Sequence, residues 1–339
     1  MAALVCVIFT GLLGSALLYG FSEAIGNAFE SQFILLGIKY LSPGIFFFVV
    51  NKVLIWIFNG KRQMKQFALA SSIRAVNIFL LCLWIIFYRE PYQYFGLAFT
   101  ISELLLFVCI VFLKPVKISI QWNYLGKWVS THCQFGSKSV IHGLLSEAFI
   151  RIDVLILGIF LSDHLVGIYS FAAFFVEGIY QVPVVIRNLN NPILVKMLLE
   201  NNIKKIITFN RKTALLSFVL TFFISLVVAL IYPYLDLIFP AETINQSFPV
   251  LLVLLAGMVI YSNFVPFDYI FLTGGLPGIQ SFFMFANTTV NIGLNFYLIP
   301  KYGLMGASMA TVISFMFACV LLNILSALLL NLPRGIFIK

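Results

Sequence analysis

The stretch GGLPGIQSFFMFANTTVNI occupies residues 274–292, and GKRQMKQFALASSIRAVNI occupies residues 60–78. The two align without gaps at a constant offset of 214, so that a glycine opens both, Gln66 meets Gln280, and the triplet VNI closes both. In each copy a turn with glycine leads into an apolar run long enough to cross a membrane. The match predicts an internal repeat that spans the chain.

Apolar windows of this kind recur along the whole chain. Hydrophobic residues make up 62% of the 339 residues and charged residues only 10%, which is too few to cover a soluble domain. The mean hydropathy is +1.05. We therefore expect an all-α membrane protein with about ten transmembrane helices. The first window lacks a basic start and a small-residue cleavage site, so it is counted as a span and not as a signal peptide. The predicted spans are 2–20, 33–57, 67–87, 94–113, 140–161, 165–186, 213–233, 249–271, 280–299 and 305–329.

The connections between these windows divide by charge. Fifteen of the 21 Lys and Arg residues lie in every second connection, around 59–66, 114–139, 187–212 and 332–339. The other connections hold only Lys39, Arg89 and Lys301, together with six acidic residues. By the positive-inside rule, the basic set faces the cytoplasm and both termini lie there. The basic residues thus set topology and contact anionic headgroups, and nucleic acid is not an expected partner.

The repeat also predicts the domain organisation. The matched stretches lead into the third and the ninth spans, so the repeat unit is six helices and both copies run in the same direction. Residues 140–339 hold a complete set of six, whereas residues 1–113 hold four. We expect two parallel bundles (4 + 6), shortened at the N-terminus from a plan of twelve. Segment 114–139 mixes aromatic residues with lysine and is predicted as a cytoplasmic amphipathic linker, with a plain polar linker as the alternative.

Two further stretches resemble a known family. IDVLILGIFLSDHLVGIYSFA (Ile152–Ala172), followed by Asn191-Pro192, and PKYGLMGASMAT (Pro300–Thr311) are similar to polysaccharide flippases. These are the Wzx-type translocases of O-antigen and capsule units in the multidrug/oligosaccharidyl-lipid/polysaccharide exporter superfamily. The resemblance implies a MATE-like two-lobed fold in the bacterial inner membrane. It also implies transfer of an undecaprenyl-pyrophosphate-linked oligosaccharide from the cytoplasmic to the periplasmic leaflet. The implied partners are that substrate, membrane lipids, and a glycan polymerase or other assembly proteins.

Charged residues inside the spans are the candidates for the transport path, because an ionisable group at bilayer depth normally faces a partner or a wet cavity. Glu147 and Arg151 lie one turn apart on one helix face, which predicts an ion pair. A guanidinium there suits a pyrophosphate or an acidic sugar. Asp153 lies about 200° around the helix from Arg151 and is expected to meet a neighbouring helix.

The next candidates lie in other spans. Glu177 is predicted either to couple transport to a proton or cation, or to join a network with Glu147. Arg74 is expected to meet a phosphate that arrives from the cytoplasm. A purely structural ion pair is the alternative for these residues. Asp268 is expected to snorkel at the inner end of its span, as Lys52 does in its own, and Glu103 has no predicted partner.

Several chemistries are not expected. The chain has no G-x-x-x-x-G-K-[ST] loop for ATP, its five cysteines lack CxxC spacing, and its three histidines are isolated. No cofactor, metal site or catalytic residue is therefore predicted, and the chain is expected to be a transporter and not an enzyme. The alternatives are a multidrug or cation exporter of the same fold, a membrane-embedded glycan polymerase or acyltransferase, and a non-functional or regulatory remnant.

Overall fold

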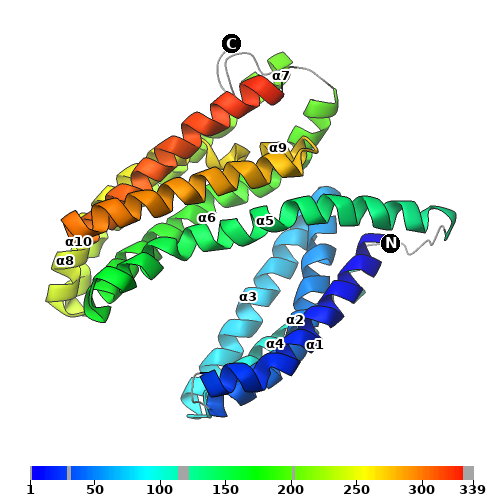
Figure 1. Ribbon diagram of the computed structural model, residues 1–339, viewed down its shortest axis with the longest axis horizontal. Coiled ribbons are helices and arrows are strands. Elements are labelled where there is room, and N and C mark those ends of the chain that lie inside the picture. The colour runs from blue at the N-terminus through cyan, green and yellow to red at the C-terminus, as the bar shows by residue number, and fades with distance from the viewer. Residues whose placement is uncertain (1, 29–31, 114–121, 201–202, 331–339) are drawn as a thin grey trace. The chain divides into compact units, whose positions relative to one another are not determined.

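The computed structural model describes residues 2–28, 32–113, 122–200 and 203–330, and within these ranges it contains helices and turns but no strand (Figure 1). The prediction of an all-α protein is confirmed. Internal packing divides the chain into two units, Met1–Phe135 and Gly136–Lys339. Each unit has its own core of buried apolar side chains.

The first unit is built around the second helix of the chain. It contains α1 (Ala2–Ala28), α2 (Gln32–Gly60), α3 (Met64–Phe87), α4 (Tyr94–Phe112) and the start of α5 (Trp122–Phe160). Helices α2 and α4 approach closely because small residues face each other, as is usual between membrane helices. A Cβ on Gly96 would lie 2.1 Å from the backbone oxygen of Gly37. The Thr100 hydroxyl donates to the Tyr40 carbonyl at 2.6 Å, so the same interface also satisfies a buried polar group.

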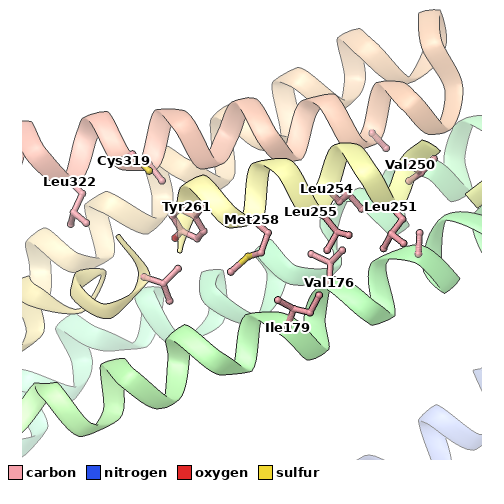
Figure 2. Packing of buried hydrophobic residues seen from close by; sticks show 14 of the residues in the cluster. Val176, Ile179, Val250, Leu251, Leu254, Leu255, Met258, Tyr261, Cys319 and Leu322 are labelled. Atoms are coloured by element: carbon pink, nitrogen blue, oxygen red, sulfur yellow. The ribbon is translucent and has the colours of Figure 1, made fainter. Parts of the chain in front are cut away.

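The second unit holds the remaining helices around α8. It contains the rest of α5, α6 (Asp163–Leu199), α7 (Ile203–Ile231), η1 (Tyr232–Leu237), α8 (Ala241–Tyr261), η2 (Val265–Phe267), α9 (Ile270–Thr273) and α10 (Pro277–Leu329). Figure 2 shows Val176 and Ile179 of α6 on one side of α8, near Leu254 and Met258. On α8, a Cβ on Gly257 would lie 2.4 Å from a methyl group of Val312, so α8 and α10 also pack through a glycine.

The helices of the structure can accommodate the ten predicted spans, although fewer of them qualify by length and composition alone. Among the described residues, eight helices are long and apolar enough to cross a membrane. One of them, α10, has 53 residues and breaks at Gly303, where φ is 58° and ψ is −130°. An unbroken helix of that length would be about 80 Å long, so α10 makes two crossings. Adding the second half of α5, which carries three charges between Glu147 and Asp153, gives the ten predicted spans.

Three boundaries differ from the predicted ones. Part of the predicted linker, 114–121, lies outside the described residues, and from Trp122 one continuous helix of 39 residues runs to Phe160. Helix α6 continues to Leu199, well into the predicted connection 187–212. Helix α8 ends at Tyr261, and its predicted span is completed by the short helices η2 and α9. Apolar windows mark where the chain contacts lipid, whereas a helix continues for as long as its backbone hydrogen bonds do.

The two copies of the repeat have similar local structure. Helix α3 begins at Met64 and α10 begins at Pro277, within one residue of the offset of 214. A residue with positive φ follows α3, Arg89 (51°), and another interrupts α10, Gly303 (58°). These two residues are 214 positions apart. A positive φ is uncommon outside turns and chain breaks. The matched breaks therefore support an ancestral repeat.

Candidate transport site

A cavity of about 320 Å³ lies in the second unit between α5, α6, α8 and α10. Four carboxylates line it: Glu147 and Asp153 on α5, Glu177 on α6, and Asp268 in the turn between η2 and α9. Among the described residues that line it, Arg187 is the one Lys or Arg. The structure thus brings three of the predicted site residues to one cavity. Charges at this depth are costly unless they are paired or wet, so the pairs decide what the cavity can do.

Arg151 pairs with Glu177, not with Glu147. Its Nη1 lies 3.2 Å from Glu177 Oε1, and its Nη2 lies 3.3 Å from Glu177 Oε2. The predicted Glu147–Arg151 pair is therefore wrong, although both residues are on α5. The long arginine side chain reaches α6, where one carboxylate accepts from both of its terminal nitrogens, which is a stronger arrangement than one contact. The Arg151 and Glu177 side chains are 64% and 35% exposed.

Asp153 is buried on a different side of α5. The Tyr169 hydroxyl of α6 donates to its Oδ2 at 2.5 Å, and the backbone N–H of Val154 donates to its Oδ1 at 2.9 Å. The expectation that Asp153 meets a neighbouring helix is confirmed. Because both of its oxygens accept hydrogen bonds, Asp153 joins α5 to α6 at the cavity wall.

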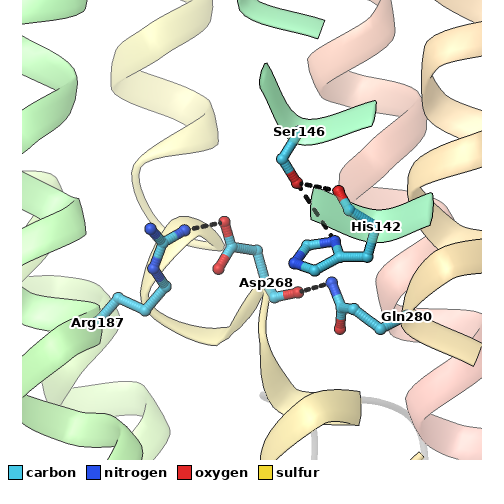
Figure 3. A network of polar contacts seen from close by, with 5 residues as sticks. All are labelled: His142, Ser146, Arg187, Asp268 and Gln280. Atoms are coloured by element: carbon cyan, nitrogen blue, oxygen red, sulfur yellow. Dashed lines mark hydrogen bonds and ion pairs between the residues drawn. The ribbon is translucent and has the colours of Figure 1, made fainter. Parts of the chain in front are cut away.

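The strongest pair in the cavity joins Arg187 and Asp268 (Figure 3). Arg187 Nη1 donates to Asp268 Oδ2 at 2.6 Å, and both side chains are only 9% exposed. The guanidinium carbon lies 4.0 Å from the ring centre of Tyr269, a cation–π contact. Gln280 Nε2 donates to the backbone oxygen of Asp268 at 2.7 Å, which ties the turn to α10.

Both members of this pair lie elsewhere than the sequence predicts. Asp268 is buried and does not snorkel, and Arg187, at the start of the predicted connection 187–212, lies within α6. A signal for Arg187 does exist in the sequence. The buried positions of α6 recur with helical spacing through Ile179, Pro183 and Ile186, and the same pattern continues to Arg187 and Asn190. For Asp268 the cause is the end of α8 at Tyr261, because the turns that follow direct this carboxylate into the cavity.

A serine and a histidine extend the polar network to α5. The Ser146 hydroxyl donates to the His142 carbonyl at 2.7 Å and lies 3.3 Å from His142 Nδ1 (Figure 3). The backbone N–H of His142 donates to the Ser281 hydroxyl of α10 at 3.2 Å. The polar contacts at this end of the cavity therefore connect α5 with α10, and α6 with the turn that holds Asp268.

The first unit contains a separate buried pair. Arg74 Nε lies 2.8 Å from Glu103 Oε1, and Glu103 is fully buried. Asn51 Nδ2 donates to Glu103 Oε2 at 2.8 Å. Glu103, for which the sequence predicts no partner, therefore has two, Arg74 and Asn51. Arg74, on α3, is partly exposed and also lies over the ring of Phe48, 5.1 Å from its centre. In this structure Arg74 neutralises a buried carboxylate, as the structural alternative expects.

Comparison with known proteins gives a family and a fold. Residues 2–197 match the model of a family described as polysaccharide biosynthesis protein. No curated protein sequence matches the chain at a significant level. Among solved structures, a MATE protein in the straight conformation has a TM-score of 0.81 at 16% identity, covering 97% of this chain and 77% of that one.

Two further solved structures are similar to this chain in fold. An outward-facing multidrug resistance MATE family transporter of the MOP superfamily has a TM-score of 0.78 at 16% identity, with 97% and 77% of the two chains covered. The lipid II flippase MurJ in an inward closed conformation has a TM-score of 0.61 at 16% identity, with 96% and 71% covered. At these identities the similarity shows the fold, and the predicted MATE-like fold is confirmed.

Proposed function

The chain belongs to the polysaccharide biosynthesis protein family, and from this membership we propose that it is a flippase for a lipid-linked oligosaccharide. The substrate is an O-antigen or capsular repeat unit on undecaprenyl pyrophosphate, moved from the cytoplasmic to the periplasmic leaflet of the bacterial inner membrane. The MATE-like fold, which this chain has in common with multidrug transporters and a lipid II flippase, supports transport as its activity. The partners are the lipid-linked substrate, membrane lipids and proteins of glycan assembly.

The observation that carries this proposal is the exposed Arg151–Glu177 pair. Arg151 lies near the middle of the predicted span 140–161, and Glu177 near the middle of 165–186. A charged group at the bilayer centre costs at least about 2.5–3.5 kcal/mol when it faces lipid. Because Arg151 is 64% exposed, this side of the unit is better explained as facing water or a polar substrate than hydrocarbon. A fixed guanidinium in such a place suits a pyrophosphate.

The remaining site residues take supporting roles in this proposal. Glu177 competes with the substrate phosphate for Arg151, and Glu147 and Glu177 are the carboxylates that could couple transport to a proton or cation. Asp153 holds α5 against α6 through Tyr169. For Arg74 the proposed role is to meet a phosphate that arrives from the cytoplasm, once its bond to Glu103 opens. The roles of Glu147, Glu177 and Arg74 require that their charges be exposed to the path for part of the cycle.

A second candidate function is export of a cationic drug. It is favoured by the composition of the cavity, where four carboxylates face one arginine. A cation would gain from that excess of negative charge, whereas an anionic substrate would need Arg151 and Arg187 to be released from their partners. Arg151 distinguishes the two functions, because the flippase needs its charge and export of a cation does not.

Leaflet distribution of the lipid-linked unit tests the proposal. In a strain that depends on this chain for its surface glycan, deletion of the gene is expected to remove the glycan. The lipid-linked unit should then accumulate where a lectin added to spheroplasts cannot reach it, and re-expression should restore its accessibility. Unchanged accessibility after deletion would contradict the flippase. Energy-dependent efflux of a cationic dye by the purified chain, without movement of the lipid, would favour the drug exporter.

The proposed direction of transport rests on the orientation of the chain, which labelling can measure. We expect Lys127→Cys to react with an impermeant maleimide only after permeabilisation, and Glu242→Cys to react in intact cells. Both variants are made in a background whose five native cysteines are serines. This outcome places segment 114–139 and both termini in the cytoplasm. The reverse labelling pattern would refute the orientation and, with it, the direction of flipping.

A further inference from the structure

A groove of about 460 Å³, open to the surface of the second unit, lies between α6 and α7. Its walls are apolar: Phe174, Phe175 and Val182 contribute from α6, and Ile224 and Val228 from α7. Two polar residues of α6, Glu177 and Gln181, line one edge of the groove. The same two residues also line the carboxylate-rich cavity. The groove and the candidate transport site therefore border the same two residues of α6.

Gly178 lies in the middle of the α6 wall. A Cβ added to this residue would meet no atom within 4 Å, so no close helix contact requires a glycine here. In this respect Gly178 differs from Gly257, whose Cβ would lie 2.4 Å from Val312. A glycine inside a helix costs about 1 kcal/mol relative to alanine. The missing side chain leaves open space in the groove, and that space can hold a ligand.

One residue that lines the groove, Glu177, carries a charge at an unusual depth in the predicted membrane span. Glu177 is paired to Arg151 at 3.2 Å, and it lies fourteen residues from the start of α6, or about 21 Å along the helix axis. A phospholipid of the bilayer keeps its phosphate at the interface, away from the hydrocarbon core of about 30 Å. Only a lipid that is crossing the bilayer brings a phosphate to the depth of Arg151.

We propose that the groove between α6 and α7 holds the isoprenoid chain of the lipid-linked substrate while its diphosphate displaces Glu177 from Arg151. This inference rests on the proposed function and assigns a site to the hydrocarbon part of the same substrate. Transfer of the isoprenoid from lipid to protein gains little from the hydrophobic effect, because both surroundings are apolar. Packing against the groove walls therefore has to favour the bound state. The phenylalanine rings and the space beside Gly178 provide that packing surface.

Filling the groove tests the proposal with a matched control. Gly178→Leu adds a side chain at the wall of the groove, where its Cβ has free space. We expect this variant to lower surface glycan by about tenfold at an unchanged protein level, which corresponds to about 1.4 kcal/mol of binding. Gly167→Leu is the control, because Gly167 is also exposed on α6, has open space around its Cβ, and lies outside the groove. The control should keep normal export.

A chemical probe tests the occupant directly. In proteoliposomes, a benzophenone-tagged isoprenyl diphosphate is expected to label peptides that contain residues 174–182 and 224–228. Undecaprenyl diphosphate should block the labelling, and excess phosphatidylglycerol should not. Equal competition by phosphatidylglycerol would mean that an ordinary bilayer lipid fills the groove, and absence of labelling would mean that no chain binds there. Either result overturns the proposal.

The leaflet assay and the Gly178→Leu variant together distinguish failure of this proposal from failure of the proposed flippase function. If the wild-type chain passes the leaflet assay while Gly178→Leu exports as well as Gly167→Leu, the groove assignment fails and the flippase stands. If the wild-type chain fails the leaflet assay, the flippase itself fails.

Discussion

Replacing Arg151 by alanine is expected to abolish surface glycan without lowering the amount of protein in the membrane. The charge is required because it meets the substrate diphosphate, which a neutral side chain cannot bind. The fold should tolerate the change, because exposed ion pairs contribute at most about 1 kcal/mol to stability and this pair is well exposed. Export is measured as surface glycan, and protein level by immunoblot of membranes.

Two companion variants decide whether the charge or the pair matters. Arg151→Lys keeps the charge but loses the two-point contact, so we expect part of the export to remain. The double variant Arg151→Ala with Glu177→Ala should stay inactive if Arg151 serves the transport path. Restored export in the double variant would show instead that Arg151 and Glu177 form a structural bridge, and the assignment of the site would then fail even if the flippase stands.

Replacing Asp268 by alanine is expected to cause the largest loss of stability of any single charge substitution proposed for this chain. The change leaves the Arg187 guanidinium buried without its 2.6 Å partner. Breaking a buried pair in this way costs about 3–5 kcal/mol. We expect a much lower midpoint of thermal unfolding in detergent and reduced accumulation in membranes. Asp163→Ala is the matched control, since this exposed aspartate at the start of α6 should contribute no more than about 1 kcal/mol.

The double variant Asp268→Leu with Arg187→Met completes the experiment. Replacing both members of a buried pair by apolar residues is often neutral, so this variant should recover most of the lost stability. It should not recover export if the cavity needs the charge of Arg187. A double variant as unstable as Asp268→Ala would show that the cost arises elsewhere in the turn, for example from the Gln280 contact to the Asp268 backbone.

The site was predicted in part, and the errors share one physical cause. Placing Glu147, Arg151, Asp153 and Glu177 inside spans needed only hydropathy, because a charge in an apolar window is visible in the sequence. Choosing their partners failed for Arg151, since helix geometry shows which residues share a face but not which helix that face meets. Glu103 shows the same limit, because its partner Arg74 lies 29 positions away on another helix.

The sequence by itself determined that the chain is helical and faces lipid, and it predicts ten spans and an internal repeat. These properties depend on local composition. A segment in lipid has to be apolar and has to satisfy its own backbone hydrogen bonds. The turns before Met64 and Pro277 precede helices because of their own residues and not because of distant contacts. The tertiary structure alone decided the ion pairs, the course of the chain after Tyr261 and the groove beside Gly178. Those features depend on how each helix is rotated against its neighbours, which is set by the packing of all side chains together and not by any one segment.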